Sequence, residues 1–205
     1  MNDLIILVAD KNTQFLLKGL LPRISYIEKT RKFVYHIIIH IERDPGVYKS
    51  CHEVLRPLLS SYLYALVIMD KAGSGHENET REDIEAHLEN NLNNNGWQDR
   101  AAAIVIDPEL ENWIWVKSKH LENAMTWSKH RDNLFSWAQA NGFKFNKGKP
   151  ILPKEAFESA LQIVNTPRSS SIYYEISASA SYKSCQDPSF QKLIYTLKTW
   201  FKVNL

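Results

Sequence analysis

Apolar residues gather in three short runs in the first half of the chain, and each run ends on an aspartate. Uninterrupted apolar runs of this length, bounded by turn residues, are typical of strands that are buried on both faces of a parallel sheet. A fourth segment, residues 33–41, is rich in β-branched and aromatic side chains and is predicted to be another strand. The three runs and the acids that end them are residues 4–9 before Asp10, residues 65–69 before Asp70 and residues 101–106 before Asp107.

Between these strands the apolar positions follow a helical period. Alternation of strands and helices predicts an α/β fold with a mainly parallel sheet and helices on both of its faces. The boundaries come from capping residues, prolines and glycines. The predicted helices are residues 12–21 (capped by Asn12 or Thr13, ended by Pro22), residues 47–61 (after a turn at 43–46) and residues 79–95 (stopped by Gly96).

After Asp107 the pattern becomes mostly helical. We expect residues 1–116 to form an α/β core and residues 117–205 a helical extension that packs on it. Asp187 is predicted to cap a last helix, and the apolar stripe of that helix is expected to pack against the domain. Trp113 or Trp115 should be largely buried. The remaining predicted elements are helices near 111–121, 129–141 and 154–164, and a loop at 142–153.

Composition narrows the class of protein without deciding it. The chain has 205 residues, a hydrophobic content of 44% and a formal net charge of +2, so its total charge does not require a nucleic-acid partner. Two cysteines, Cys51 and Cys185, form neither a disulfide framework nor a metal motif. No signal peptide and no membrane-length apolar run is present, so we expect a soluble cytoplasmic protein without a membrane partner.

The carboxylates at the strand ends are the best candidates for chemistry. Ligands of parallel sheets collect at the carboxyl ends of the strands, and converging carboxylates suit Mg²⁺. Asp10 and Asp70 have an alternative role as turn or cap acids. Asp107, followed by Pro108, has a stronger alternative as a helix N-cap. Two further acids, Glu109 and Glu111, follow closely, and Glu111 lies beside tryptophans, so it should be buried and need a partner.

The loop after Asp70 reads Ala-Gly-Ser-Gly-His, with Gly73, Ser74, Gly75 and His76 as its candidate functional residues. Its glycines would let the backbone approach a phosphate or a metal, and His76 is a candidate proton donor. The loop lacks the lysine of a phosphate-binding loop and the full dinucleotide-binding glycine pattern, so a plain loop is the alternative. The basic, phenylalanine-containing stretch at 143–154 fits either a phosphate-backbone contact or a solvated loop.

The strand ending at Asp10, the segment DKAGSGHE from Asp70 and the segment IDPELENWIW from Ile106 together resemble the Toprim-type domain. More narrowly, this series and the later SYKSCQDPSFQKL are similar to a small protein of bacterial methylation-associated defence systems, related to RloB-like and OLD-type proteins. The general resemblance covers residues 1–116 and the narrower one nearly the whole chain. It implies a Toprim-like, Rossmann-like core with Mg²⁺ as cofactor. It also implies nucleic acid and other defence-system proteins as partners.

In Toprim domains a glutamate after the first strand and a later Asp-x-Asp pair hold Mg²⁺. The resemblance places Asp10 at the glutamate position and Asp70 at the first aspartate, whereas Ala72 stands at the second; Glu109 or Glu111 would complete the site. It therefore implies an anti-phage nuclease that cleaves phosphodiester bonds with Mg²⁺. Two alternatives are a catalytically degenerate subunit that binds a partner protein or nucleic acid, and a small-ligand sensor that uses Gly73–Gly75.

Overall fold

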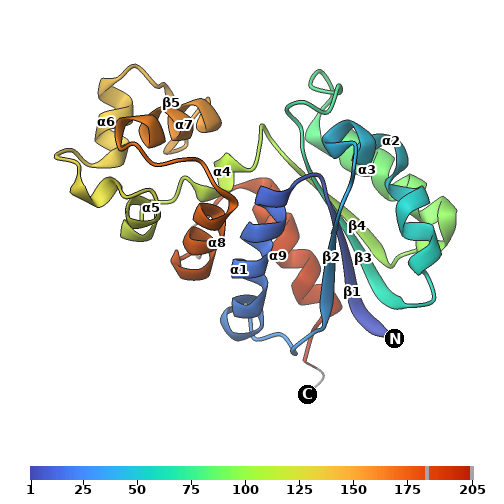
Figure 1. The fold of residues 1–205 in the computed structure, drawn as a ribbon. Helices are drawn as coiled ribbons and strands as arrows, with labels where there is room; N and C mark the ends of the chain where they lie inside the picture. The colour runs from blue at the N-terminus through green and yellow to red at the C-terminus, as the bar shows by residue number, and fades with distance from the viewer. Residues whose placement is uncertain (183–184, 204–205) are drawn as a thin grey trace.

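The computed structural model describes residues 1–182 and 185–203 and shows an α/β fold built on a parallel sheet (Figure 1). Each of the four segments predicted as strands is a strand, and each neighbouring pair in the sheet is parallel. The order across the sheet is β2-β1-β3-β4. The strands are β1 (Asn2–Val8), β2 (Tyr35–Ile39), β3 (Tyr62–Asp70) and β4 (Ala101–Ile106).

Helices cover both faces of this sheet, which explains why the central strands are continuous apolar runs (Figure 1). On one face, α1 (Lys11–Ile27), α8 (Ser170–Ser179) and α9 (Pro188–Trp200) share an apolar cluster with Leu4 and Leu66. On the other face, α2 (Arg43–Leu55) and α3 (Arg81–Leu92) pack on Ile5 and Val67. The predicted α/β class with helices on both faces is confirmed.

Both predicted boundaries of the first helix are wrong. Helix α1 is capped by Asp10, whose carboxylate accepts a 2.7 Å hydrogen bond from the N–H of Thr13, and not by Asn12 or Thr13 itself. The helix also continues through Pro22. Pro22 is exposed, and the carbonyl that loses its usual N–H partner belongs to Lys18, which is also exposed. The apolar face of α1 continues past the proline, and its burial outweighs the lost hydrogen bond.

The segment at 43–46, predicted as a turn, is instead the first turn of α2. Pro45 lies where a helical N–H needs no partner, so the proline is compatible with the helix. Asp107 is not the N-cap that the Asp-Pro sequence predicts, because α4 (Glu111–Ile114) begins only after Leu110. Gly96 does adopt the predicted left-handed conformation, with φ at 99°.

The C-terminal half is mostly helical, as predicted, and its core is continuous with the apolar cluster on one face of the sheet. Trp113 and Trp115 are both buried. Asp187 caps α9 by accepting from the N–H groups of Ser189 and Phe190, as predicted. The loop at 142–153 contains a short hairpin, and the segment at 169–180, for which no element was predicted, holds α8. The other elements are α5 (Lys119–Ala124), α6 (Leu134–Ala140), β5 (Phe145–Asn146), β6 (Lys149–Pro150) and α7 (Pro153–Ile163), with single turns at Arg56–Leu58, Asn93–Trp97 and Trp127–Lys129.

Across the described residues, none of the helices combines the length and the apolar character that a membrane span needs. The division at residue 116 stays a prediction. The apolar cluster that contains Leu66 of β3 also contains Leu193 of α9, so residues from both sides of that boundary share one core.

Candidate functional site

The sheet order places a topological switch point between β1 and β3. From β1 the chain passes through α1 to the neighbouring strand β2, and it then returns on the other side of β1 to form β3. The helices that follow β1 and β3 cover opposite faces of the sheet, so the chain diverges at their carboxyl ends (Figure 1). Ligands of open α/β sheets bind at this kind of crevice. Asp10 follows β1 and Asp70 ends β3, so both candidate acids lie there.

Asp70 is the most perturbed carboxyl group of this edge. Its backbone N–H donates a 2.8 Å hydrogen bond to Oδ1 of Asp44. Its own Oδ1 is inaccessible to solvent and has no hydrogen-bond partner in the part of the chain that the structure describes. Burial raises the pKa of Asp70 well above its ordinary value, and the negative charges of Asp44, Glu111 and Asp10 raise it further.

Asp44 belongs to this group, although its Asp-Pro-Gly context predicted a turn without a functional role. It lies in the first turn of α2, just beyond the carboxyl end of β2. Burial raises its pKa from 3.8 to about 6, and the nearby charge of Asp10 adds to the shift. The rule that singled out Asp10 and Asp70, an acid directly at the end of a parallel strand, misses Asp44 because β2 ends at Ile39 and Asp44 follows in the first turn of α2.

Asp10 has the capping role that was its alternative reading, because its Oδ1 accepts from the N–H of Thr13. Its charge nevertheless reaches the other two acids, since it raises the pKa of both Asp44 and Asp70. We call Asp10, Asp44 and Asp70 the acidic triad. Its members lie at or beyond the carboxyl ends of three adjacent strands, β1, β2 and β3, and they repel one another.

Glu111 lies near the triad but is engaged elsewhere. It is only 2% exposed, as its position beside the tryptophans predicted, and it has the expected partner. Nη2 of Arg168 donates to Oε1 of Glu111 at 2.6 Å, and the hydroxyl of Tyr173 donates to the same oxygen. Arg168 also donates a 2.9 Å hydrogen bond to the Tyr173 hydroxyl and pairs with Glu158 at 2.8 Å. This network ties α4 to α7 and α8.

Glu109 and Asp107 are also paired with cations. Nζ of Lys154 lies 3.7 Å from Oε2 of Glu109, and the backbone N–H of Lys154 donates to Oε1 at 3.3 Å. Burial and the charge of Glu111 raise the pKa of Glu109. Asp107 pairs with Lys71 at 3.2 Å, and its side chain is about half exposed. These two acids therefore have positive partners, whereas none of the ion pairs within residues 1–182 and 185–203 involves a member of the triad.

The backbone N–H groups of the loop that contains Gly73 and Gly75 find their hydrogen-bond acceptor within the loop itself. Gly73 and Gly75 have positive φ angles, of 79° and 85°, and their N–H groups donate to the same carboxylate oxygen of Glu77 at 2.8 and 3.1 Å. The backbone N–H of Glu77 itself, followed by those of Gly75 and Gly73, lowers the pKa of the Glu77 carboxyl group. Ser74 is buried and its hydroxyl accepts from the N–H of His76. The carboxylate of Glu77 occupies the position that a bound anion would take.

The imidazole ring of His76 is engaged in two contacts within the protein. Its Nδ1 forms a 2.6 Å interaction with Glu79, and its ring stacks on Tyr48 with the centroids 3.4 Å apart. Tyr48 in turn stacks on His87, with centroids 4.5 Å apart. These contacts join the loop to α2 and α3. The proton-donor role of His76 stays a prediction.

The triad matches Mg²⁺ in donor chemistry, since all of its ligating atoms would be carboxylate oxygens. The unpartnered Oδ1 of Asp70 is the atom in greatest need of a cation. As the side chains stand, no group of three or more His, Cys, Asp or Glu residues within 1–182 and 185–203 is arranged to hold a metal ion. A shared ion would therefore require side-chain rotation.

Comparison with known proteins gives no match: no family model, no curated protein and no solved structure is similar to this chain. The resemblance to Toprim-type domains stays a prediction. The geometry of the strand ends therefore carries the functional argument.

Proposed function

We propose that this chain is a Toprim-like component of a bacterial defence system that cleaves phosphodiester bonds in nucleic acid with a divalent cation held by the acidic triad. One observation carries the proposal: an unpartnered, solvent-inaccessible oxygen of Asp70 lies among the charges of Asp10 and Asp44 at the switch point of the sheet. The defence setting is supported by the sequence resemblance. The cation site is supported by the chemistry of the three carboxylates.

The energetic argument starts from repulsion. A buried carboxylate without a partner is costly, and a second or third carboxylate nearby increases that cost. The raised pKa of both Asp44 and Asp70 expresses this strain. Two outcomes relieve it, namely protonation and cation binding. Mg²⁺ is suited to the second because it prefers oxygen ligands and keeps coordination positions for water and phosphate oxygens.

The chain itself supplies the positioning. The N-terminus of α1 fixes Asp10 through the N–H of Thr13, and the backbone of Asp70 fixes Asp44. A divalent cation bound by the triad would stabilise charge on a phosphate oxygen as a Lewis acid. Glu111 contributes to this positioning through its ion pair with Arg168 and its hydrogen bond with Tyr173, which hold α4 and α8 together near the strand ends.

A catalytically degenerate subunit, which binds a partner protein or nucleic acid and leaves chemistry to other proteins, is the second candidate. Two observations favour it. Ala72 provides no ligand at the position of the second Toprim aspartate. Glu109 and Glu111 are both occupied by cationic partners rather than directed to a shared point with the triad.

Thermal unfolding in Mg²⁺, in Mn²⁺ and in a chelator distinguishes the two candidates. For the cation site we expect a rise in melting temperature of about 5–10 °C at an ion concentration near one hundred times the dissociation constant. Asp44→Asn and Asp70→Asn should abolish this rise, whereas Glu77→Gln, which removes an exposed loop carboxylate, should retain it.

Cleavage of labelled single- and double-stranded DNA and RNA, with the same variants, provides the second measurement. Metal-dependent cleavage by the wild type that disappears in Asp70→Asn supports the nuclease function. A wild-type protein whose melting temperature does not respond to either ion refutes the cation site and favours the degenerate subunit. A metal-dependent rise without any cleavage retains the site and refutes the nuclease activity of the isolated chain.

A further inference from the structure

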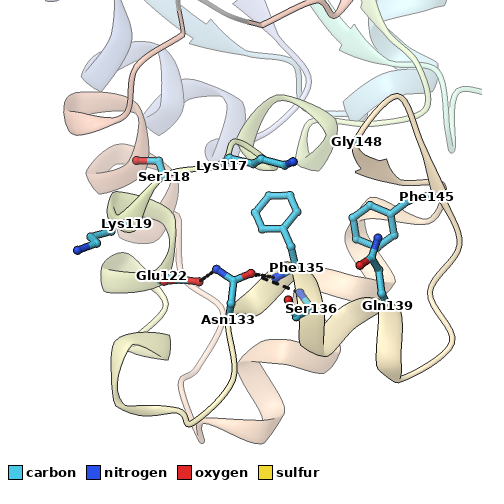
Figure 2. A pocket seen from close by; sticks show the side chains of 10 residues that line it. All are labelled: Lys117, Ser118, Lys119, Glu122, Asn133, Phe135, Ser136, Gln139, Phe145 and Gly148. Carbon is cyan, nitrogen blue, oxygen red and sulfur yellow. Dashed lines mark hydrogen bonds between the residues drawn. The ribbon is translucent and has the colours of Figure 1, made fainter.

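A pocket of about 660 Å³ lies in the C-terminal half, between α5, α6 and the β5–β6 hairpin (Figure 2). We call it the aromatic pocket; Lys117, Ser118, Phe135, Gln139, Phe145 and Gly148 line it. In Figure 2 the Phe135 ring projects from α6 into its centre, with Phe145 to one side and the Lys117 chain above. Its volume is within the range of small-ligand sites. None of these residues takes part in the acidic triad.

Two phenylalanine rings form an aromatic wall of the pocket, and both pack against a buried tryptophan. The rings of Phe135 and Phe145 lie 6.2 Å apart with an angle of 50° between their planes. Each ring also contacts the buried Trp115 edge-to-face, at 5.3 and 6.4 Å. The indole N–H of Trp115 donates to the carbonyl of Pro153 at 2.8 Å, which fixes the base of the wall. Both phenylalanine rings stay partly accessible, so a flat ligand has a fixed apolar surface to stack on.

The polar groups around this wall divide into two classes. Asn133 is committed to the protein, because Glu122 accepts from its amide and its carbonyl oxygen caps α6. The side-chain amide of the exposed Gln139, by contrast, forms no hydrogen bond within the described chain, and it lies below Phe145 (Figure 2). An amide offers both a donor and an acceptor, as the edge of a nucleobase requires.

A second hollow of about 940 Å³ adjoins the pocket and shares Lys117, Ser118 and Gly148 with it. We call it the basic hollow, because four cationic side chains (Arg81, Lys117, Lys147 and Lys149) outnumber the three acidic ones (Glu82, Asp107 and Asp187) in its lining. It extends to Asp107 at the end of β4. Nζ of Lys149 donates to the carbonyl of Asn112. Lys117 and Lys147 are exposed and form no ion pair with any described residue, so their charges remain available for phosphate groups.

We propose that the aromatic pocket and the basic hollow form a binding groove for single-stranded nucleic acid, with a nucleobase stacked on Phe135 and the backbone following Lys117 and Lys147. Stacking on a protein ring requires a base that is free of its duplex neighbours, which selects single strands. The basic hollow leads from the pocket towards the strand ends of the sheet. The groove deepens the proposed nuclease function by naming the form of its substrate, and its test is independent of cleavage.

Fluorescence anisotropy in a chelator tests the groove without metal chemistry. The probes are labelled oligothymidylate and oligouridylate of about 15 nucleotides and a duplex of the same length. The wild type should bind the single strands more tightly than the duplex, and the ratio between the two single-stranded probes assigns DNA or RNA. Phe135→Leu should weaken binding about ten-fold through lost stacking. Phe143→Leu, which alters a partly buried ring packed on Trp137 instead, should leave it unchanged.

Exposed lysines give a test that does not depend on packing. The double variant Lys117→Gln with Lys147→Gln should reduce the slope of log affinity against log salt concentration by about 1.4, since each phosphate contact on a single strand contributes about 0.7. Lys129→Gln with Lys144→Gln, two exposed lysines outside both hollows, is the matched control. Wild-type protein that binds neither single strand, that prefers the duplex, or whose affinity survives both sets of groove substitutions would overturn the proposal.

The proposed cation site and the proposed binding groove can be refuted independently of each other. Asp70→Asn should retain full binding of the single strand in the chelator, and the groove variants should retain the rise in melting temperature with Mg²⁺. If Asp70→Asn instead lost binding as completely as Phe135→Leu, the nucleic acid would be held at the strand ends and the groove assignment would be refuted.

Discussion

The backbone N–H of Asp70 donates a 2.8 Å hydrogen bond to Oδ1 of Asp44, which joins the end of β3 to the first turn of α2. This bond holds two carboxyl groups of the same sign close together at the switch point of the sheet. The contact orients Asp44 but brings two acids that repel each other close together. Burial and the neighbouring negative charges raise the pKa of both acids. Such an arrangement sacrifices stability at neutral pH, as functional sites often do.

The loss of stability caused by burying Asp44 can be measured from its dependence on pH. Its pKa is about 6 in the folded chain, against an ordinary 3.8, so the folded state binds this proton more tightly than the unfolded state does. The free energy of unfolding should therefore fall as the pH rises from about 4 to about 6. In a chelator, Asp44→Asn should raise it by about 1–3 kcal/mol near pH 7.5 and leave it nearly unchanged near pH 4.

Urea unfolding at the two pH values checks this prediction. Glu53→Gln, in the same helix but with a side chain that is 75% exposed, is the control and should have little effect at either pH. A loss of stability in Asp44→Asn near pH 7.5, or an equal gain at both pH values, would contradict the repulsion argument.

Substitutions in the hydrogen-bond network of Glu111 test whether this carboxylate has a structural role or is a metal ligand. Glu111→Gln removes the buried charge that balances Arg168 and should destabilise the fold by about 1.5–3 kcal/mol, because Arg168 then keeps only its ion pair with the more exposed Glu158. Tyr173→Phe removes one hydrogen bond to the same oxygen and should cost about 1–2 kcal/mol. Urea unfolding measures both values.

The melting-temperature rise with Mg²⁺ should persist in Glu111→Gln, provided the variant is folded, since the triad does not require this side chain. If the rise disappeared, Glu111 would be identified as a metal ligand, in agreement with the Mg²⁺ site that the sequence predicted.

The sheet could be predicted because its central strands are buried on both faces, and this burial leaves continuous apolar runs that are bounded by turn residues and too short for a buried helix. The boundaries of α1 were mispredicted for a local reason. An aspartate three residues before Thr13 and a solvent-facing Pro22 both look like ordinary breaks until the buried face of the helix is known. Helix α8 had no distinct pattern because serines and tyrosines fill it, and its formation depends on close packing against α1.

The site was only partly predictable. Asp10 and Asp70 could be identified from strand ends, and Glu111 from its tryptophan neighbours. The partners of Glu111 could not, because Arg168 and Tyr173 are more than fifty residues away and only the packing of α8 brings them close. Asp44 was hidden by its Asp-Pro-Gly context, which is typical of a turn. The aromatic pocket likewise needs the tertiary arrangement of α6 and the hairpin.

The packing of α9 on the sheet gives a prediction about the C-terminal part. Leu193 is fully buried in the apolar cluster that includes strand residues such as Leu66. Leu193→Ala should lower the free energy of unfolding by about 2–5 kcal/mol. Tyr195→Ala, on the same helix but 72% exposed, should change it by no more than about 0.5 kcal/mol. Equal effects of the two substitutions in urea unfolding would refute this placement of α9.

The contact between α1 and α8 gives the sharpest test of how the two ends of the chain pack. A methyl group on Gly19 would lie 2.6 Å from the carbonyl oxygen of Tyr174 and 2.9 Å from the backbone nitrogen of Ala178. Both are backbone atoms of α8, so the helices must separate, yet Arg23 fixes their register by donating to the carbonyls of Ser177 and Ala180 at 2.6 and 2.9 Å.

Gly19→Ala should therefore destabilise the protein by about 1–3 kcal/mol through overpacking, even though alanine favours a helix by about 1 kcal/mol over glycine. Lys18→Ala, at the exposed neighbouring position, should be nearly neutral. Urea unfolding measures both variants. Because alanine improves every isolated helix, a Gly19→Ala protein that is as stable as the wild type or more stable would mean that α8 does not approach α1 this closely. The C-terminal half would then have to pack on the sheet in another way.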